Sequence, residues 1–394
     1  MEGDFKNTRL LVIAHSYKAF QKIQIELLAP LFKEITVLVR YKPIAELYRV
    51  FNFPGLKNHS KNNAIDLYNL PENVKVLTTA LNYLPLKRFY RNLGKKHFSA
   101  VDKQIERNNI KFDVVLAHFL WTSGYVANEI AKKYNKPAFI IVHENAKRLE
   151  EHLQFSDTQK WKIAGAFSVN RKNIGILKNT FKSVSYLPNT YNDSLFVPLN
   201  KIEVRNQLGL PKDKQIILNV ANYTIKDKNQ LNLIDAFHRY HEKNKNTMLY
   251  LIGNDAGDKG KIRDHIENLN LESVIVIVGS IRNNVLPIWM NTADIFILPS
   301  NNESFGIVQV EALACGIPVV ATRNGGSEEI LNEEIGVLSE GKDAESLCKA
   351  IEKANLIKWD KEKIAQSSDS FKRKRYSAIF IDKIKFILNE EVSI

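Results

Sequence analysis

The sequence predicts an α/β protein made of two doubly wound domains with parallel sheets. Three observations lead to this prediction. The chain has 394 residues, which is more than a single hydrophobic core usually serves. Short apolar runs alternate with helical segments, as in sheets covered by helices on both faces. The alternation stops in a polar, turn-rich stretch at 188–207 and then restarts, so this stretch marks the domain boundary.

Seven apolar runs are the expected strands of the first half. They are short and do not alternate between apolar and polar residues, as is typical of parallel strands buried on both faces. Helical segments such as 122–134 separate them. The runs are 9–14, 35–39, 74–78, 113–117, 138–142, 166–169 and 183–187.

The second half repeats this pattern with five expected strands, and helices are expected at 230–241 and 285–291. An amphipathic helix is expected over 371–394, so we place the domain boundaries after residues 195 and 370. The strand runs are 215–220, 247–253, 273–279, 294–298 and 317–321.

Composition narrows the class of protein. Charged residues are 25% and hydrophobic residues 44% of the chain, a balance typical of globular proteins. No run of 18 apolar residues predicts a membrane-spanning helix, and the first residues do not resemble a signal peptide. Cys315 and Cys348 form neither a disulfide framework nor a metal pattern. We therefore expect a cytoplasmic protein.

Positive charge is concentrated in the first half. Residues 1–200 contain 30 Lys and Arg against 16 Asp and Glu, whereas the remainder is nearly neutral. This asymmetry indicates an anionic partner, such as membrane lipid or an acidic acceptor, although solubility alone also explains it. No nucleic-acid-binding signature is present, so nucleic acid is not expected.

The segment 83–109 is the most basic part of this half. An apolar stripe is flanked by cations, which is the pattern of a helix that lies on an anionic membrane surface. The alternative is an ordinary solvated helix with one face in the core. The stripe is Leu86, Phe89, Tyr90 and Leu93, and the cations are Lys87, Arg88, Arg91, Lys95 and Lys96.

Three histidines follow strands of the first half, at the sheet edge where open α/β sheets bind ligands. They are His15, His118 and His143. A lone histidine at such a place is usually structural, but three together favour a functional role for at least one. His143 is the strongest candidate because it ends the most apolar strand and is followed at once by Glu144.

Residues 298–331 contain a strand, a loop, a helix, a strand and a second loop, Asn324-Gly325-Gly326. Parallel strands place both loops and two helix N-termini at one sheet edge, where we expect free N–H groups that favour anions. Glu303 and Glu311 frame this corner. Glu311 lies one helical turn beyond Ile307, where a carboxylate can accept two ribose hydroxyls.

Two lysines follow the strand 215–220 and precede a helix. Lys226 or Lys228 could place a point charge on a phosphate at the same edge. Gly306 would allow the backbone to approach a ligand closely. Together these residues predict a nucleotide-diphosphate site with a hydroxyl-rich group attached.

No metal site and no cofactor are expected. The loop 253–260 contains Asp255 and Asp258, but no other acidic residue completes a coordination shell. We therefore interpret this loop as a turn.

The second half resembles the donor site of the retaining GT-B glycosyltransferases of family 4. The resemblance rests on Glu303 and Glu311 with seven residues between them, on 316–319 (Gly-Ile-Pro-Val) and on Gly325-Gly326. It implies two Rossmann-like domains that face a cleft, with residues 1–195 binding the acceptor and 196–370 the nucleotide-sugar. The helix 371–394 would cross back to the first domain.

The resemblance also implies roles for single residues. Lys228 would bind the diphosphate, Glu311 the ribose, and Glu303 the donor sugar near its anomeric centre. His143 is similar in place to a histidine that contacts the donor sugar. Ser304 and Phe305 would complete the nucleotide-sugar site. Gly306 and Ile307, where the following helix starts, would present their backbone to the phosphate and the sugar.

Two loops depart from the family pattern. Ala221-Asn222 stands where the family has Gly-Arg, so one cation is lost at Asn222 and Lys226 could replace it. The loop 15–20 lacks the usual Gly-Gly pair. His15 or Lys18 would then supply contacts to the donor or the acceptor, with His118 a further candidate.

The resulting hypothesis is a metal-independent, retaining glycosyltransferase in cell-surface polysaccharide or glycolipid synthesis. It would use a UDP- or GDP-sugar and a sugar or lipid-linked acceptor, in the cytoplasm or at the inner face of the membrane. Two alternatives are a sugar-nucleotide epimerase on the same fold and a catalytically inert partner of another transferase.

Overall fold

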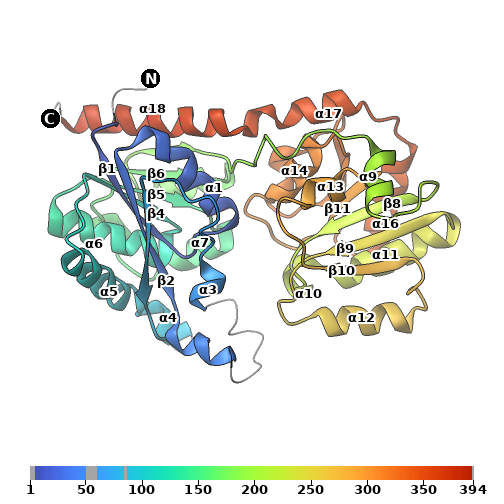
Figure 1. Ribbon diagram of the computed structural model, residues 1–394, viewed down its shortest axis with the longest axis horizontal. Helices are drawn as coiled ribbons and strands as arrows, with labels where there is room; N and C mark the ends of the chain where they lie inside the picture. Colours follow the sequence, from blue (N-terminus) through green and yellow to red (C-terminus); the bar gives the residue numbers. More distant parts are fainter. Residues whose placement is uncertain (1–4, 50–59, 84–86, 393–394) are drawn as a thin grey trace. The chain divides into compact units, whose positions relative to one another are not determined.

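The computed structural model describes residues 5–49, 60–83 and 87–392. The chain forms two compact units, and the last helix belongs to the first of them (Figure 1). The first unit is Met1–Thr190 with Arg373–Ile394, and the second is Tyr191–Lys372. The boundaries drawn from sequence differ from these by a few residues.

The first unit contains a parallel seven-stranded sheet in the order β3-β2-β1-β4-β5-β6-β7. All seven expected strands are present. The order reverses between β1 and β4, and this switch point is where open α/β sheets bind ligands. The strands are β1 (Arg9–Ala14), β2 (Glu34–Tyr41), β3 (Val74–Ala80), β4 (Val114–His118), β5 (Ala138–Val142), β6 (Gly165–Ser168) and β7 (Val184–Tyr186).

Helices bury the apolar side chains of this sheet. One continuous core joins the sheet to α5, α6, α7 and α8, as expected for helices whose apolar stripes face a sheet. Two shorter helices, α3 and α4, precede α5. The bounds are α1 (Ala19–Leu28), α3 (Lys61–Ala64), α4 (Lys87–Arg91), α5 (Leu93–Arg107), α6 (Tyr125–Tyr134), α7 (Ala146–Leu153) and α8 (Lys172–Lys178).

The last helix, α18 (Arg373–Val392), packs onto the first unit. The ring of Phe380 is fully buried and lies 5.3 Å from the ring of Phe167 on β6. Gly165 leaves the room that Ile387 occupies, because a Cβ there would lie 2.7 Å from its Cδ1. The amphipathic pattern of the C-terminal segment therefore corresponds to a helix with one face in a core.

The second unit contains a parallel six-stranded sheet in the order β10-β9-β8-β11-β12-β13. Its switch point lies between β8 and β11. The strand β13 was not expected, because a four-residue run ending in serine is too short for a periodicity signal. The strands are β8 (Gln215–Val220), β9 (Thr247–Ile252), β10 (Ile275–Gly279), β11 (Ile295–Leu298), β12 (Val319–Thr322) and β13 (Gly336–Ser339).

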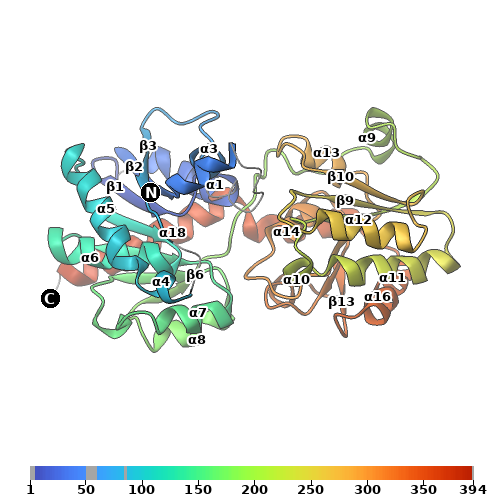
Figure 2. The ribbon, with the colours of Figure 1, turned by 90° about the horizontal axis from the view of Figure 1, so that it is seen from below.

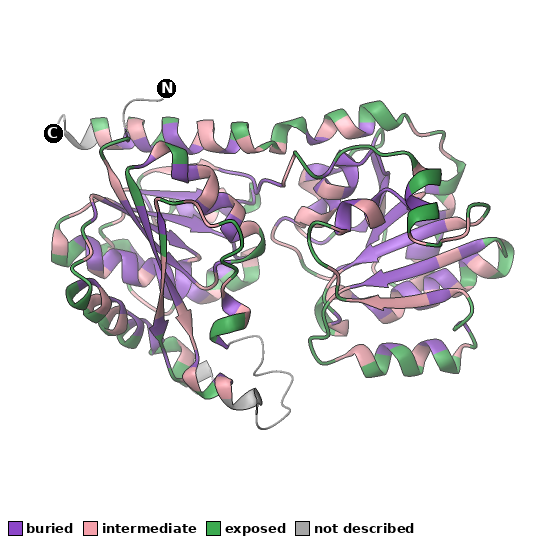
Figure 3. Ribbon diagram, viewed as in Figure 1, coloured by how far each residue is buried: buried purple, intermediate pink, exposed green. Residues whose placement is uncertain are grey.

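Helices α11, α12 and α16 share one hydrophobic core with this sheet. Figure 2 shows α11 and α12 side by side. Figure 3 shows that the strands are mostly buried, except for the edge strand β10, while the helices keep exposed outer faces. The helices are α9 (Lys201–Gln207), α10 (Ile225–Lys228), α11 (Gln230–Lys243), α12 (Lys259–Asn268), α13 (Leu286–Met290), α14 (Ile307–Ala314), α15 (Ser327–Ile330), α16 (Ala344–Leu356) and α17 (Lys361–Ser367).

The basic segment 83–109 forms two helices, α4 and α5, which are separated at Asn92. Its apolar stripe divides between core and surface, since Leu93 is fully buried and Phe89 is 43% exposed. Leu86 lies outside the described residues, as do the side chains of Lys87 and Arg88. In the described parts of the chain, no helix is both long and apolar enough to cross a membrane.

Candidate functional site

The switch point of the second sheet brings together two residues that are 75 positions apart. Lys228 follows β8 and Glu303 follows β11, and the Lys228 Nζ forms an ion pair with the Glu303 Oε1. The Ser300 Oγ donates a hydrogen bond of 2.8 Å to the same oxygen. Because β8 and β11 are adjacent parallel strands, their carboxyl ends present both charges at one corner.

Lys228 is the last residue of the one-turn helix α10. The backbone N–H of Ile225 at its start donates to the Asp258 Oδ2 at 3.0 Å. The Asn301 N–H donates to the Asp227 carbonyl at 2.8 Å. This lysine is therefore held between the loop after β11 and the loop after β9.

The loop after β9 is a turn, as expected. The Asp255 Oδ1 accepts hydrogen bonds from the N–H groups of Gly257, at 2.8 Å, and Lys259, at 3.3 Å. The carboxylates of Asp255 and Asp258 thus bind backbone amides. Within the described ranges, no group of three or more His, Cys, Asp or Glu side chains could hold a metal ion.

Asn222, on the loop after β8, and Lys226, in α10, are both exposed. The Asn222 carbonyl accepts from the Gln230 Nε2 at 2.8 Å, which ties this loop to α11. A Cβ at Gly253 would lie 1.8 Å from the Ala221 carbonyl oxygen. The two loops therefore pack at backbone contact, and Asn222 offers an amide where the resemblance leads one to expect a cation.

Helix α14 begins directly after the Glu303 loop. Gly306, at its N-terminus, has a φ of 79°, and no side chain caps the helix, so its first amides and its dipole favour an anion. The Phe305 ring is buried and packs edge-on against Phe371, at 5.5 Å between centroids. Phe305 can thus offer only its backbone to a ligand, while Ser304 and Ile307 are half-buried at the corner.

Glu311 lies one turn into α14 and is half-buried. Burial raises the pKa of its carboxyl group to about 8. Its carboxyl group has no hydrogen-bond partner among the side chains and backbone that the structure describes. Its oxygens can therefore accept the hydroxyls of a bound ligand.

The expectation of free N–H groups at the second helix, α15, is wrong. The N–H groups of Asn324 and Gly325 donate to the Glu328 Oε2 at 3.0 and 2.8 Å. Those of Gly326 and Ser327 donate to the Asn324 Oδ1. These two side chains act as local caps, so an anion would find the amides occupied.

The glycine pair after β12 serves loop packing instead. A Cβ at Gly326 would lie 2.6 Å from the Phe305 carbonyl oxygen, and one at Gly325 would lie 3.1 Å from that of Glu303. The Glu303 N–H donates to the Asn324 carbonyl at 2.9 Å. The second loop therefore supports the backbone that carries Glu303.

The first unit brings two of the three candidate histidines together at its own sheet edge. The His118 Nδ1 lies 3.1 Å from the His143 Nε2, and the two rings are parallel with centroids 5.3 Å apart. Burial lowers the pKa of His118 to about 3 and holds the pKa of His143 well below its usual value. Both imidazoles are therefore neutral near pH 7, and the N–H of one donates a hydrogen bond to the unprotonated nitrogen of the other.

His15 follows β1 and stacks on Phe119, with ring centroids 4.7 Å apart. Its Nε2 is buried without a hydrogen-bond partner in the described part of the chain. Burial also lowers the pKa of this ring far below its usual value. Lys18 lies farther along the loop, and its ammonium group donates to the Asn63 carbonyl at 2.7 Å.

Glu144 is a positioning residue that the sequence marked only as a neighbour of His143. It is 2% exposed, and its Oε1 accepts from the N–H groups of Leu120, at 2.9 Å, and Trp121, at 3.4 Å. The same oxygen lies 3.0 Å from the His152 Nδ1. Glu144 thus fixes the loop that follows His118, and only the tertiary structure shows this contact.

Residues 200–369 match the model of the family described as "Glycosyl transferases group 1". This match confirms the resemblance stated from the sequence. The D-inositol 3-phosphate glycosyltransferase of Arthrobacter sp. (strain FB24) is 26% identical over 250 residues, which are 59% of this chain and 59% of that protein. The chain thus spans about 60% of the length of the first curated relatives it matches.

Solved structures share the fold. Sucrose-phosphate synthase from Thermosynechococcus elongatus has a TM-score of 0.71 and 18% identity, over 98% of this chain and 100% of that one. Anabaena HepE, solved in complex with UDP and glucose, has a TM-score of 0.72 and 16% identity, over 96% of this chain and 100% of that one. With these neighbours, the two parallel-sheet α/β domains identify the fold as GT-B.

Proposed function

We propose that this chain, whose residues 200–369 form a glycosyl transferases group 1 domain, transfers a sugar from a UDP- or GDP-sugar to an acceptor hydroxyl with retention of configuration. The acceptor is a sugar or a lipid-linked sugar, in the synthesis of a cell-surface polysaccharide or glycolipid. The observation that carries the proposal is the Lys228–Glu303 ion pair at the switch point of the second sheet.

The corner around this ion pair suits a nucleotide diphosphate. A phosphate group would replace Glu303 as the partner of Lys228, because a dianion attracts the ammonium group more strongly than a carboxylate does. The uncapped N-terminus of α14 adds a second source of positive potential. The Glu303 carboxylate, once released, would accept hydroxyls of the donor sugar, and Glu311 would accept those of the ribose.

The chemical step follows from these positions. The bond between the anomeric carbon and the diphosphate oxygen breaks, and the acceptor oxygen bonds to the same face of that carbon. The acceptor proton passes to the departing phosphate oxygen. Lys228 and the α14 N-terminus stabilise the charge that develops on the leaving group, which is the main demand of such a reaction. The proposed step uses no metal ion and no cofactor.

The first unit would bind the acceptor. Because His143 is neutral and has a buried Nδ1 without a described partner, it can exchange one hydrogen bond with a sugar hydroxyl. His118 would set which nitrogen of His143 carries the proton. We place the enzyme in the cytoplasm, at the inner membrane face when the acceptor is lipid-linked.

Calorimetry with UDP and with GDP tests the donor site. We expect the wild-type protein to bind one of them, and Lys228→Met to weaken that binding tenfold or more, since a charge-assisted hydrogen bond contributes roughly 1.5–3 kcal/mol. Lys212→Met is the matched control, because Lys212 is exposed and precedes β8 at the opposite sheet edge.

The outcomes separate the alternatives. Unchanged affinity in Lys228→Met would refute the site assignment. Binding of neither nucleotide by the wild-type protein would favour the catalytically inert partner. Conversion of a nucleotide-sugar to its epimer without an acceptor would favour the epimerase.

A further inference from the structure

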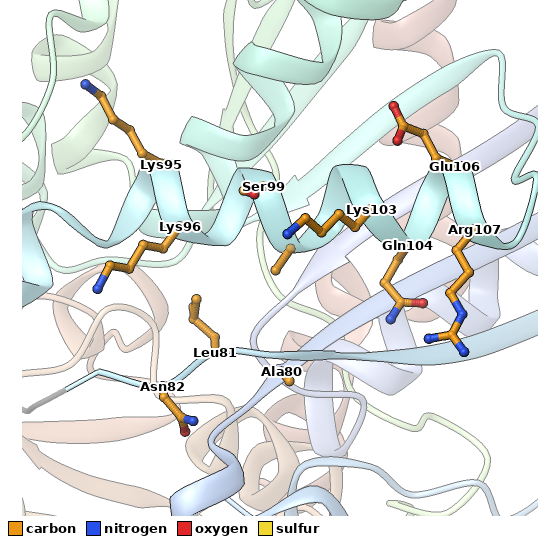
Figure 4. A pocket seen from close by; sticks show the side chains of 11 residues that line it. Ala80, Leu81, Asn82, Lys95, Lys96, Ser99, Lys103, Gln104, Glu106 and Arg107 are labelled. Atoms are coloured by element: carbon orange, nitrogen blue, oxygen red, sulfur yellow. The ribbon is translucent and has the colours of Figure 1, made fainter.

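The first unit has an open groove between the end of β3 and helix α5, with a volume of about 900 Å³ (Figure 4). One wall is formed by residues 80–82, where β3 ends, and the other by one side of α5. Because β3 is the edge strand of the sheet, no further strand among the described residues covers this wall. The residues of α5 that line the groove are Lys95, Lys96, Ser99, Ala100, Lys103, Gln104, Glu106 and Arg107.

Four cations line this groove and are exposed: Lys95, Lys96, Lys103 and Arg107. Their side chains form no ion pair or hydrogen bond with any residue in the described ranges. The one acidic residue of the lining, Glu106, has its Oε1 2.8 Å from the Lys133 Nζ. The groove therefore carries a positive charge that the protein itself does not neutralise.

The neighbouring surface of α6 differs. Lys132 pairs with Glu129 at 3.3 Å, and Lys133 pairs with Asp102 at 2.7 Å. Lys132 and Lys133, outside the groove, thus have carboxylate partners on the protein. The lysines that line the groove have none in the described ranges.

The spacing of the cations suits an extended ligand. Lys96, Lys103 and Arg107 are seven and four residues apart, which places them on one helix face. At a rise of about 1.5 Å per residue, they form a row roughly 16 Å long. A single small anion would use one end of such a row, whereas a chain with repeated negative charges would use all of it.

The remaining lining indicates a hydroxyl-rich chain. Ser99, Gln104 and Asn82 offer uncharged hydrogen-bonding groups between the cations. No large apolar side chain of α5 is exposed, so this face lacks the groups that insert into a bilayer. Among the described residues, the lining contains no aromatic ring on which a nucleic-acid base could stack.

We propose that this groove binds a glycan chain that carries carboxylate or phosphate groups. One wall of the groove is the carboxyl end of β3, and His118 and His143 lie at the carboxyl ends of β4 and β5, at the same edge of this parallel sheet. A chain lying along α5 would thus lead toward the sheet edge that holds His118 and His143. The role of this glycan as the acceptor rests on the proposed function, whereas its binding to the groove does not.

The test compares ligands on the full-length protein by calorimetry or fluorescence anisotropy. The anionic probe is an oligogalacturonate, which carries one carboxylate per sugar, and the neutral probe is a maltooligosaccharide. Vesicles of phosphatidylglycerol and phosphatidylcholine represent a membrane, and single-stranded DNA represents nucleic acid. We expect binding of oligogalacturonate alone or at least tenfold preferentially, weakened by added salt.

Charge-reversal variants locate the binding. Lys96→Glu, Lys103→Glu and Arg107→Glu in combination should weaken oligogalacturonate binding tenfold or more. A control with the same change in charge, Lys33→Glu, Lys178→Glu and Lys182→Glu, should change it less than twofold, because these three lysines are exposed elsewhere on the same unit. If the groove variant does not fold, the corresponding glutamine variant replaces it.

Three results would overturn the proposal: no binding of oligogalacturonate, equal losses in the groove and control variants, or vesicles or DNA bound at least as tightly as the glycan. UDP affinity, measured on the same samples, separates this proposal from the donor site. The groove variant should keep the wild-type affinity for UDP, and absence of UDP binding in the wild type would refute the donor proposal while leaving the glycan result to stand by itself.

Discussion

Replacement of Glu311 by glutamine should make the second unit more stable at alkaline pH. Burial raises the pKa of this carboxyl group from an ordinary value near 4.5 to about 8. In the unfolded chain the group ionises near pH 4.5, whereas in the folded protein it keeps its proton up to about pH 8. The folded state therefore binds more protons across this window, and its stability falls as the pH rises.

The pKa values set the size of this effect. A difference of roughly 3.5 pKa units corresponds to about 5 kcal/mol, at about 1.4 kcal/mol per unit. This is an upper bound, because Glu311 is only half-buried and water screens part of the cost. As the pH rises from 5 to 9, the free energy of unfolding of Glu311→Gln should increase by about 2 kcal/mol relative to that of the wild type. The exposed Glu272→Gln should show no such gain.

Urea unfolding at several pH values measures this difference. A second measurement follows UDP affinity between pH 7 and pH 8.5, where a phosphate group with a second pKa near 6 is already ionised. If the ionised carboxylate accepts the ribose hydroxyls, wild-type affinity should rise across this range and that of Glu311→Gln should stay flat. Parallel pH profiles of stability for the two proteins would refute the argument from burial.

Three further predictions concern stability. Gly326→Ala should lower the free energy of unfolding by about 1–3 kcal/mol in urea titrations, since a Cβ would lie 2.6 Å from a backbone oxygen; Gly260→Ala, where nothing lies within 4 Å, should not. Acidification from pH 6.5 to 5.5 should destabilise the first unit by about 1 kcal/mol for each buried neutral histidine, because only the unfolded chain takes up the proton. In urea titrations at both pH values, His118→Asn should lose less stability on acidification than the wild type does. Phe380→Ala should lower the free energy of unfolding by about 3–5 kcal/mol in denaturation experiments, because this ring is fully buried. Phe386, on the same helix, is 57% exposed, and Phe386→Ala should lower it by under about 1 kcal/mol. Equal losses would contradict the packing of α18.

Local sequence was enough to locate most of the fold. The apolar runs became buried parallel strands because a run without alternation can be buried on both faces only in a covered sheet. β13 was missed, since four residues carry too little periodicity. The expected strand ends at 14 and 142 were correct, and the expected end at 117 is one residue short of β4, which ends at His118; these ends placed the three histidines at one sheet edge.

Pairing between distant residues depended on the tertiary structure. Glu303 and Lys228 were both singled out from sequence, but their ion pair depends on the adjacency of β8 and β11. The capping of α15 by Asn324 and Glu328 reversed an expectation of free amides, because side-chain rotamers decide which donors are occupied. For Lys95 and Lys96 the sequence left open a membrane-facing helix or a solvated helix, whereas the structure shows a groove beside them, between α5 and the end of β3.

The sequence by itself determined the two-domain α/β class, the family resemblance and the residue types of the donor corner. These depend on composition, short-range periodicity and fixed spacing, which a linear chain records directly. Only the tertiary structure decided which charges meet, that the Glu311 carboxyl has no hydrogen-bond partner in the described part of the chain, and that His118 and His143 form a hydrogen bond. Such properties depend on burial and on contacts between residues far apart in the chain.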